Sequence, residues 1–192
     1  MKEVHVVNPE ELKRKLSKFK PDNFHLVADF DSTLTRAFID GKRVFSSYAY
    51  VRGGKYLSQD FVDRSMELTR HYRPIEFDPN IPQKEKDEKM VEWWSKHYEL
   101  LIECGMNTKV IDEIIKDNKI LLRKGSSEFF DLIKKYDVPL LIFSAGLGNL
   151  IEEFFKSKGM LTKKTHIISN YLVFDKNGKA VSYNRPLIHT FN

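Results

Sequence analysis

The chain has 192 residues, of which 41% are hydrophobic and 31% charged, and its formal net charge is +5. This length suits one domain, or a small core that carries an insertion. The lysines and arginines are scattered and form no long run, so nucleic acid is not favoured as a partner. A single cysteine, Cys104, excludes an internal disulfide and is typical of a reducing compartment.

The sequence has no stretch that approaches the length of a membrane span, about 18 consecutive apolar residues. The N-terminal residues also lack the apolar centre of a signal peptide. We therefore expect a cytoplasmic protein with no membrane association.

The first predicted elements alternate between helix and strand. Residues 8–18 read as a helix that an Asn-Pro pair begins. Residues 24–28 are apolar in both alternating phases, as in a strand buried on both faces of a parallel sheet, and they end at Asp29. Residues 37–45 read as a hairpin that turns at an Asp-Gly pair.

The middle of the sequence has a different pattern, with helical spacing of apolar residues and no strand-like run. Helices are predicted over 58–71, 83–104 and 107–116. A proline-punctuated connector, residues 73–82, separates the first two. We expect this block to be a helical insertion.

The alternation of helix and strand resumes after the insertion. Helices are predicted over 126–136 and 147–158, and strands over 138–143 and 166–169. A second hairpin is predicted over 171–183, with its turn at an Asp-Lys-Asn-Gly segment. This rhythm indicates an α/β fold with a parallel sheet, whose ligands bind at the carboxyl ends of the strands.

Two polar segments are predicted to meet at that edge of the sheet. Asp29 and Asp31 follow one strand, and Ser144-Ala145-Gly146 follow another. Two neighbouring carboxylates are held most easily together with a cation such as Mg²⁺, which prefers oxygen ligands. One aspartate can attack phosphorus while the other acts as a general acid and base. The alternative interpretation is a simple turn with helix-capping aspartates.

These residues carry a resemblance to a known family. The segment DFDST fits the D-x-D-x-T signature of haloacid-dehalogenase-type phosphatases, and the chain as a whole resembles the cytosolic pyrimidine 5′-nucleotidases. The segments that carry the resemblance are VADFDSTLT, DGKR, MVEWW, LIFSAGLGNLIEE, ISNYLVFDKNGK and LIHTFN.

The resemblance implies a haloacid-dehalogenase-like (HAD-like) Rossmannoid parallel sheet with an inserted helical cap domain. The core would comprise residues 1–46 and 121–192, and the cap residues 47–120. The implied activity is Mg²⁺-dependent hydrolysis of a nucleoside 5′-monophosphate, with a pyrimidine base, through an aspartyl-phosphate. Two alternatives stay open: a catalytically impaired fragment or homologue that only binds nucleotide, and a phosphatase for another small phosphate.

The resemblance also assigns the catalytic and metal-binding residues. Asp29 would be the nucleophile and a Mg²⁺ ligand. Asp31 would be the general acid and base, and its backbone carbonyl would bind the metal as well. Thr33 would orient the loop that holds both aspartates.

The substrate-binding residues follow in the same way. Ser144 and Ala145 would hold the phosphoryl group, and Gly146 would allow the backbone to approach it. Glu92, beside two tryptophans, would contact the nucleotide base. On the residues alone, a solvated glutamate on a helix with core tryptophans is the alternative for Glu92.

Two parts of the family pattern have no match in the sequence. These are a lysine that follows the LIHTFN segment and a later G-D-x-x-x-D loop. The chain thus resembles the N-terminal two-thirds of a nucleotidase. The strand over 24–28 is then expected to be an edge, which favours self-association or pairing with a complementing chain.

Overall fold

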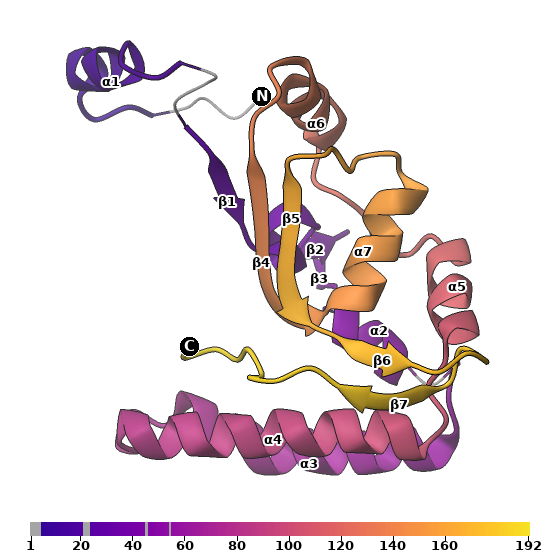
Figure 1. Ribbon diagram of the computed structural model, residues 1–192. Coiled ribbons are helices and arrows are strands. Elements are labelled where there is room, and N and C mark those ends of the chain that lie inside the picture. Colours follow the sequence, from indigo (N-terminus) through magenta and orange to yellow (C-terminus); the bar gives the residue numbers. More distant parts are fainter. Residues whose placement is uncertain (1–4, 21–23, 45, 54) are drawn as a thin grey trace.

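The computed structural model of the protein describes residues 5–20, 24–44, 46–53 and 55–192. Its centre is a parallel sheet of three strands, in the order β1-β4-β5 (Figure 1). The strands are β1 (Leu26–Ala28), β4 (Leu140–Leu147) and β5 (Thr165–Asn170). Leu26 pairs with Leu140, and Leu140 pairs with Thr165, so the carboxyl ends of all three strands lie on one edge.

Helices α6 (Ser126–Lys135) and α7 (Gly148–Ser157) belong to this core. Helix α7 packs against β4 and β5. The alternation of side chains along β4 sends Leu140 and Ile142 into the buried cluster, where Phe154 and Phe155 of α7 also lie. The parallel α/β core predicted from the sequence is therefore confirmed.

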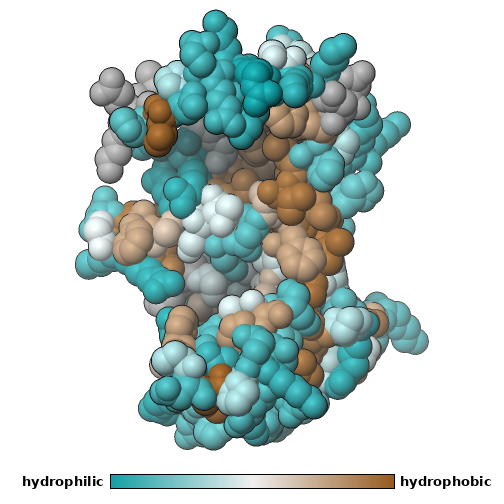
Figure 2. All heavy atoms as spheres, turned by 90° about the vertical axis from the view of Figure 1, so that its left-hand side faces the viewer, coloured by the Kyte–Doolittle hydropathy of each residue, from teal (hydrophilic) through white to brown (hydrophobic). Residues whose placement is uncertain are grey.

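The other face of the sheet is partly uncovered in the described part of the chain. Register and alternation place Val27, Phe143 and Ile168 on the same face, and their exposed fractions are 61%, 38% and 45%. Figure 2, which views the molecule from the side of β1, shows apolar atoms in a band down the molecule. Among the described residues, β1 pairs with β4 alone and so lies at an edge of the sheet, as expected.

The helical insertion has four helices among the described residues. They are α2 (Ser47–Arg52), α3 (Gln59–Phe77), α4 (Gln83–Glu103) and α5 (Thr108–Lys116). The long helices α3 and α4 lie side by side below the carboxyl ends of the strands (Figure 1). Helix α5 instead packs against α7 of the core.

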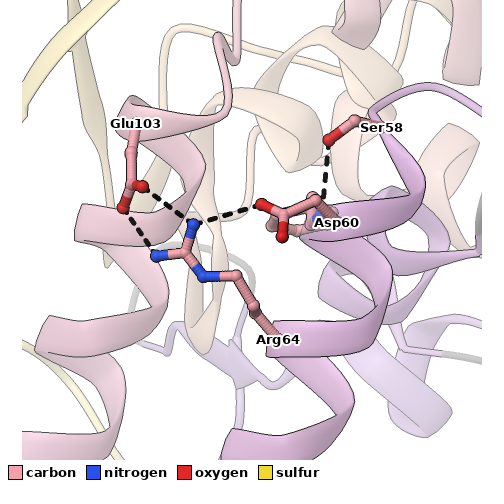
Figure 3. Close-up of polar contacts among 5 residues, drawn as sticks. Ser58, Asp60, Arg64 and Glu103 are labelled. Atoms are coloured by element: carbon pink, nitrogen blue, oxygen red, sulfur yellow. Dashed lines mark hydrogen bonds and ion pairs between the residues drawn. The ribbon is translucent and has the colours of Figure 1, made fainter.

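An ion-pair cluster joins the start of α3 to the end of α4 (Figure 3). The Arg64 guanidinium donates to both oxygens of Glu103, at 2.8 and 2.7 Å, and to Asp60 at 3.2 Å. Ser58 caps α3 by accepting from the Phe61 N–H. A bidentate arginine–carboxylate pair fixes both position and orientation, so α3 and α4 form a braced antiparallel pair.

The remaining elements lie at the ends of the chain and in two small sheets. Helix α1 (Pro9–Leu16) has Asn8 as its N-cap, as predicted. The hairpins β2–β3 and β6–β7 also match the predictions. Their strands are Phe38–Ile39 and Lys42–Arg43, then Leu172–Phe174 and Ala180–Tyr183. Within the described residues, none of the helices has the length and apolar character that crossing a bilayer requires.

Two predicted boundaries were wrong. Helix α3 continues to Phe77 through Pro74, where a connector was expected, because proline removes one N–H but the next turn still closes on its carbonyl, from the Asp78 N–H. Strand β4 continues to Leu147 rather than ending at Phe143. Helix α2, which begins after the cap residue Ser46, was not predicted at all.

Candidate active site

The loop after β1 is fixed by an aromatic anchor. Phe30, which lies between the two aspartates, is fully buried. Its ring meets those of Phe154 and Phe155 edge to face, with centroids 5.6 and 5.5 Å apart. Because Phe30 points into the core, Asp29 remains exposed and Asp31 only partly buried.

Hydrogen bonds close this loop into a tight turn over Phe30–Leu34. Ser32 has a φ of 63°, a left-handed conformation that a non-glycine residue rarely adopts. Its N–H donates to Thr35 Oγ1 at 2.9 Å, and the Thr35 N–H donates to the Phe30 carbonyl at 3.0 Å. The Arg123 side chain donates to the Ser32 carbonyl at 2.6 Å. Thr35 therefore stabilises the turn through bonds within the loop, and Arg123 stabilises it from a distant part of the chain.

Asp29 and Thr33 are in direct contact. The Thr33 hydroxyl donates to Asp29 Oδ2 at 3.0 Å. This bond orients the exposed carboxylate across one turn of the loop. Thr33 therefore contacts the Asp29 side chain directly, in addition to being part of the loop.

Asp31 is held by the first residue of α2. Its Oδ1 accepts from the Ser47 backbone N–H and its Oδ2 accepts from the Ser47 hydroxyl, both at 2.7 Å. Burial raises the pKa of Asp31 to about 6, although the Ser47 hydrogen bonds act in the opposite direction; the charge of Asp29 adds to the rise. A carboxyl group with this pKa exchanges protons readily near neutral pH.

The second polar segment meets the first at Gly146. A Cβ atom at this position would lie 2.5 Å from Ser47 Oγ, 3.2 Å from Ser144 Oγ and 3.3 Å from Asp31 Oδ2. The Gly146 N–H donates to Ser144 Oγ at 3.1 Å. The carboxyl end of β4 thus reaches Asp31, as predicted, and only glycine fits there without displacing these oxygens. Ala145 lies between these two residues, at the same strand end.

Glu92 lies on α4, and its described contacts are all within the insertion. Its Oε1 accepts from Lys96 at 2.6 Å and from Tyr72 at 2.7 Å, and its Oε2 accepts from Lys89 at 2.9 Å. These bonds, that of Lys96 foremost, lower the pKa of Glu92 to about 2. The Trp93 ring stacks on Tyr72 with centroids 5.8 Å apart. Glu92 is therefore an ionised group beside an aromatic pair.

Sequence reasoning missed Ser47, Thr35 and Arg123. Ser47 is 16 residues from Asp31 and lies in a helix that the apolar pattern did not predict. Arg123 is 91 residues from Ser32. The local sequence carried one usable signal, since Ser46-Ser47 is a typical helix start. The Ser47 contact depends on how the insertion folds back onto the core, and the Arg123 contact on how the two parts of the core meet.

The oxygen atoms of the loop suit a hard divalent cation. They include the exposed Asp29 carboxylate and backbone carbonyls, which are ligands that Mg²⁺ prefers. Within the described residues, no group of three or more His, Cys, Asp or Glu side chains is placed to hold a metal. A cation held by one or two carboxylates and completed by water and phosphate fits such a sparse set.

Comparison with known proteins gives consistent matches. The 7-methylguanosine phosphate-specific 5′-nucleotidase of Gallus gallus is 34% identical over 192 residues, 98% of this chain and 66% of its own length. The human protein of the same name is 36% identical over 183 residues, 95% of this chain and 61% of its own length. The chain thus spans at most two-thirds of the length of these curated relatives.

The solved structures agree with these matches. A crystal structure of cytosolic 5′-nucleotidase IIIB bound to cytidine superposes with a TM-score of 0.83 at 33% identity, covering 98% of this chain and 64% of that one. A HAD family hydrolase from Salmonella enterica shares the fold alone, with a TM-score of 0.57 and 16% identity. The family model described as pyrimidine 5′-nucleotidase (UMPH-1) matches residues 32–192. The chain belongs to the UMPH-1 pyrimidine 5′-nucleotidase family, on a HAD-like fold.

Proposed function

We propose that the protein hydrolyses a nucleoside 5′-monophosphate to nucleoside and phosphate. The observation that supports this most is the meeting of two strand ends, where Gly146 lies directly against Asp31 and Ser47. This contact supports the proposed roles of Asp31, whose pKa is about 6, as the acid and of the backbone around Gly146 as the phosphate-binding segment, beside Asp29 as the nucleophile.

In the first step Asp29 attacks phosphorus, while Asp31 donates its proton to the departing 5′-oxygen. This forms an aspartyl-phosphate and releases the nucleoside. Asp31, now ionised, takes a proton from water, which attacks the phosphorus and regenerates Asp29. Ser144, Ala145 and Gly146 hold the phosphoryl oxygens through both steps, and the Thr33 hydroxyl orients Asp29.

A magnesium ion held by Asp29 and the Asp31 carbonyl would neutralise charge on the phosphoryl oxygens. The Asp31 side chain is already bonded to Ser47 through both oxygens. The backbone carbonyl of Asp31 would thus hold the metal, while its side-chain carboxyl would transfer the proton.

The insertion is proposed to act as the cap that encloses the nucleoside, with core boundaries at residues 1–46 and 121–192 and the cap over 47–120. Glu92 would read the base while a tryptophan ring supports it. A pyrimidine is proposed from the family match, and 7-methylguanine is the competing base because the curated relatives are named for 7-methylguanosine phosphate. We also propose a cytosolic location, which the solved relative's own description supports.

The exposed edge of β1 is proposed to pair with another chain, a second copy or a complementing one. Val27 is 61% exposed on this strand, and apolar side chains lie on the same sheet face. Unpaired strand edges recruit further strands through their backbone hydrogen-bonding groups.

The experiment that tests the function combines phosphate release with trapping of the covalent intermediate. The chain is supplied with Mg²⁺ and ³²P-labelled cytidine or 7-methylguanosine monophosphate, then quenched in acid. Wild type should carry label on Asp29, and Asp29→Asn should carry none and release no phosphate, because an amide cannot form the acyl-phosphate. Nucleotide binding without label or turnover would favour the alternative of a binding-only homologue. Turnover retained by Asp29→Asn would exclude the proposed mechanism.

A further inference from the structure

The first two residues of α2 contact different parts of the protein. Ser47 holds the Asp31 carboxyl, as described above. Tyr48, the next residue, shares a 2.7 Å hydrogen bond between its hydroxyl and Nδ1 of His97 on α4. Both partners are almost fully buried, with exposed fractions of 6% and 2%. Because Ser47 and Tyr48 are adjacent in one short helix, α2 connects the Asp31 carboxyl to His97.

The next residue of α4 reaches the other half of the site. The Tyr98 hydroxyl donates to the Gly146 carbonyl at 3.4 Å and to the Asn170 carbonyl at 3.3 Å. The adjacent residues His97 and Tyr98 therefore touch both the helix that holds Asp31 and the segment proposed to hold phosphate. Helix α4 thus contacts both.

The same helix carries the proposed base-reading group. Glu92 lies five residues before His97 on α4, and the Tyr48 ring meets Trp94 edge to face at 5.5 Å. Helix α4 is joined to α3 by the exposed Arg64–Glu103 ion pair (Figure 3). Glu92 and His97 thus lie on one helix, and His97 links that helix to Tyr48.

We propose that Tyr48 and His97 are positioning residues that couple the seating of a nucleoside against α4 to the placement of Asp31 by Ser47. The coupling deepens the proposed function and rests on it. Hydrogen bonds in a buried setting hold their geometry strongly, which suits them to transmit a displacement. A substrate that contains a nucleoside would then be hydrolysed faster, because it improves the placement of Asp31. A phosphate ester without a nucleoside would not gain this effect.

The test compares two single-hydroxyl deletions on α2. Tyr48→Phe removes the bond to His97, whereas Tyr50→Phe removes a bond to the Lys119 carbonyl, leaves the Tyr48–His97 bond in place and serves as the matched control. With Mg²⁺ and cytidine monophosphate, Tyr48→Phe should lower kcat about tenfold while KM changes less than about twofold. With p-nitrophenyl phosphate, which has no nucleoside, Tyr48→Phe and Tyr50→Phe should both match wild type.

Two further variants keep the proposal testable if Tyr48→Phe folds poorly. His97→Gln retains an acceptor for the Tyr48 hydroxyl, so its kcat on cytidine monophosphate relative to p-nitrophenyl phosphate should stay as in wild type. His97→Leu removes the acceptor, and this ratio should fall. Amide exchange over residues 90–103 gives a readout that needs no turnover. Adding Mg²⁺ and inorganic phosphate should slow exchange there in wild type and Tyr50→Phe but not in Tyr48→Phe, with phosphate affinity measured separately by calorimetry.

The outcomes separate the coupling from the function beneath it. Equal loss on both substrates, or no loss on either, would overturn the coupling, and so would equal exchange responses in the two tyrosine variants. If wild type neither binds phosphate nor turns over, or if Asp29→Asn remains active, the proposed function fails and the coupling fails with it. Suppose that Asp29→Asn is inactive but that Tyr48→Phe has the same ratio of activities on cytidine monophosphate and p-nitrophenyl phosphate as wild type. The proposed function would then stand, and only the coupling would be overturned.

Discussion

Both carboxylate oxygens of Asp31 are bonded to one residue, Ser47, through its backbone N–H and its hydroxyl at 2.7 Å each. This bidentate contact joins the loop after the first strand to the first turn of the helical insertion. It defines the orientation of the proposed acid and lowers a pKa that burial otherwise raises.

The Ser47→Ala variant should therefore titrate at higher pH than wild type. Removing the hydroxyl deletes a donor to the ionised form of Asp31, so its pKa should rise from about 6. In a pH–rate profile, the limb governed by Asp31 should therefore shift to higher pH. Ser46→Ala is the matched control, because Ser46 caps α2 without contacting Asp31 in the described contacts. A profile that shifts equally in both variants would contradict this account.

Glu92→Ala should weaken discrimination among bases more than it slows a generic phosphate ester. A lost hydrogen bond to a base should cost about 1–3 kcal/mol in transition-state binding. The measurement is kcat/KM for cytidine, 7-methylguanosine and adenosine monophosphates and for p-nitrophenyl phosphate. Glu88→Ala, an exposed change one turn earlier on α4, is the control. Equal losses on all substrates would mean that Glu92 is structural.

Gly146→Ala should reduce both stability and turnover, because its Cβ would lie 2.5 Å from Ser47 Oγ. The Ser47 hydroxyl would have to move, and Asp31 with it. The double variant Gly146→Ala/Ser47→Ala removes the closest clash, so its free energy of unfolding should approach that of Ser47→Ala alone. Strictly additive losses would show that the clash lies elsewhere.

Acidification should destabilise the protein through His97. Burial, with a contribution from the charge of Arg52, lowers the pKa of His97 to about 3, whereas an unfolded histidine titrates near about 6.5. Between these values the unfolded chain binds a proton that the folded chain does not, so stability is complete above pH ~6.5 and falls as the pH drops.

Urea unfolding at pH 7 and pH 4.5 measures this effect. One proton corresponds to about 1.4 kcal/mol per pH unit within the window. His97→Gln cannot titrate there, so its stability should depend less on pH by up to that amount. A variant with the same pH dependence as wild type would show that His97 is protonated in the folded state.

Val27→Lys should reduce self-association through the β1 edge. A lysine on an exposed edge strand opposes the pairing of two such edges by charge and solvation. Light scattering over a range of protein concentrations should show a mass that rises for wild type and stays monomeric for the variant. Val173→Lys, at an exposed position on β6, is the control. A monomeric wild type would contradict self-association, while leaving a complementing chain to be tested by mixing.

The α/β core, the two hairpins and the approach of Gly146 to Asp31 could all be predicted from the sequence. These follow from local rules, because apolar runs of strand length define parallel strands and parallel strands bring their carboxyl ends to one edge. The edge position of β1 among the described residues was predicted from the family resemblance and not from these local rules.

Contacts between residues far apart in the chain, within and between the insertion and the core, could be seen only in the folded structure. Ser47 reaches Asp31 across 16 residues, Tyr48 reaches His97 across 49, and Arg123 reaches Ser32 across 91. Such pairs leave no mark in hydrophobic periodicity, which reports only which face of an element is buried. The partner of each buried polar group, and hence the pKa of Asp31, is set by the packing of α2 and α4 against the loop. That packing brings together residues far apart in the chain, so it cannot be predicted from any one segment of the sequence.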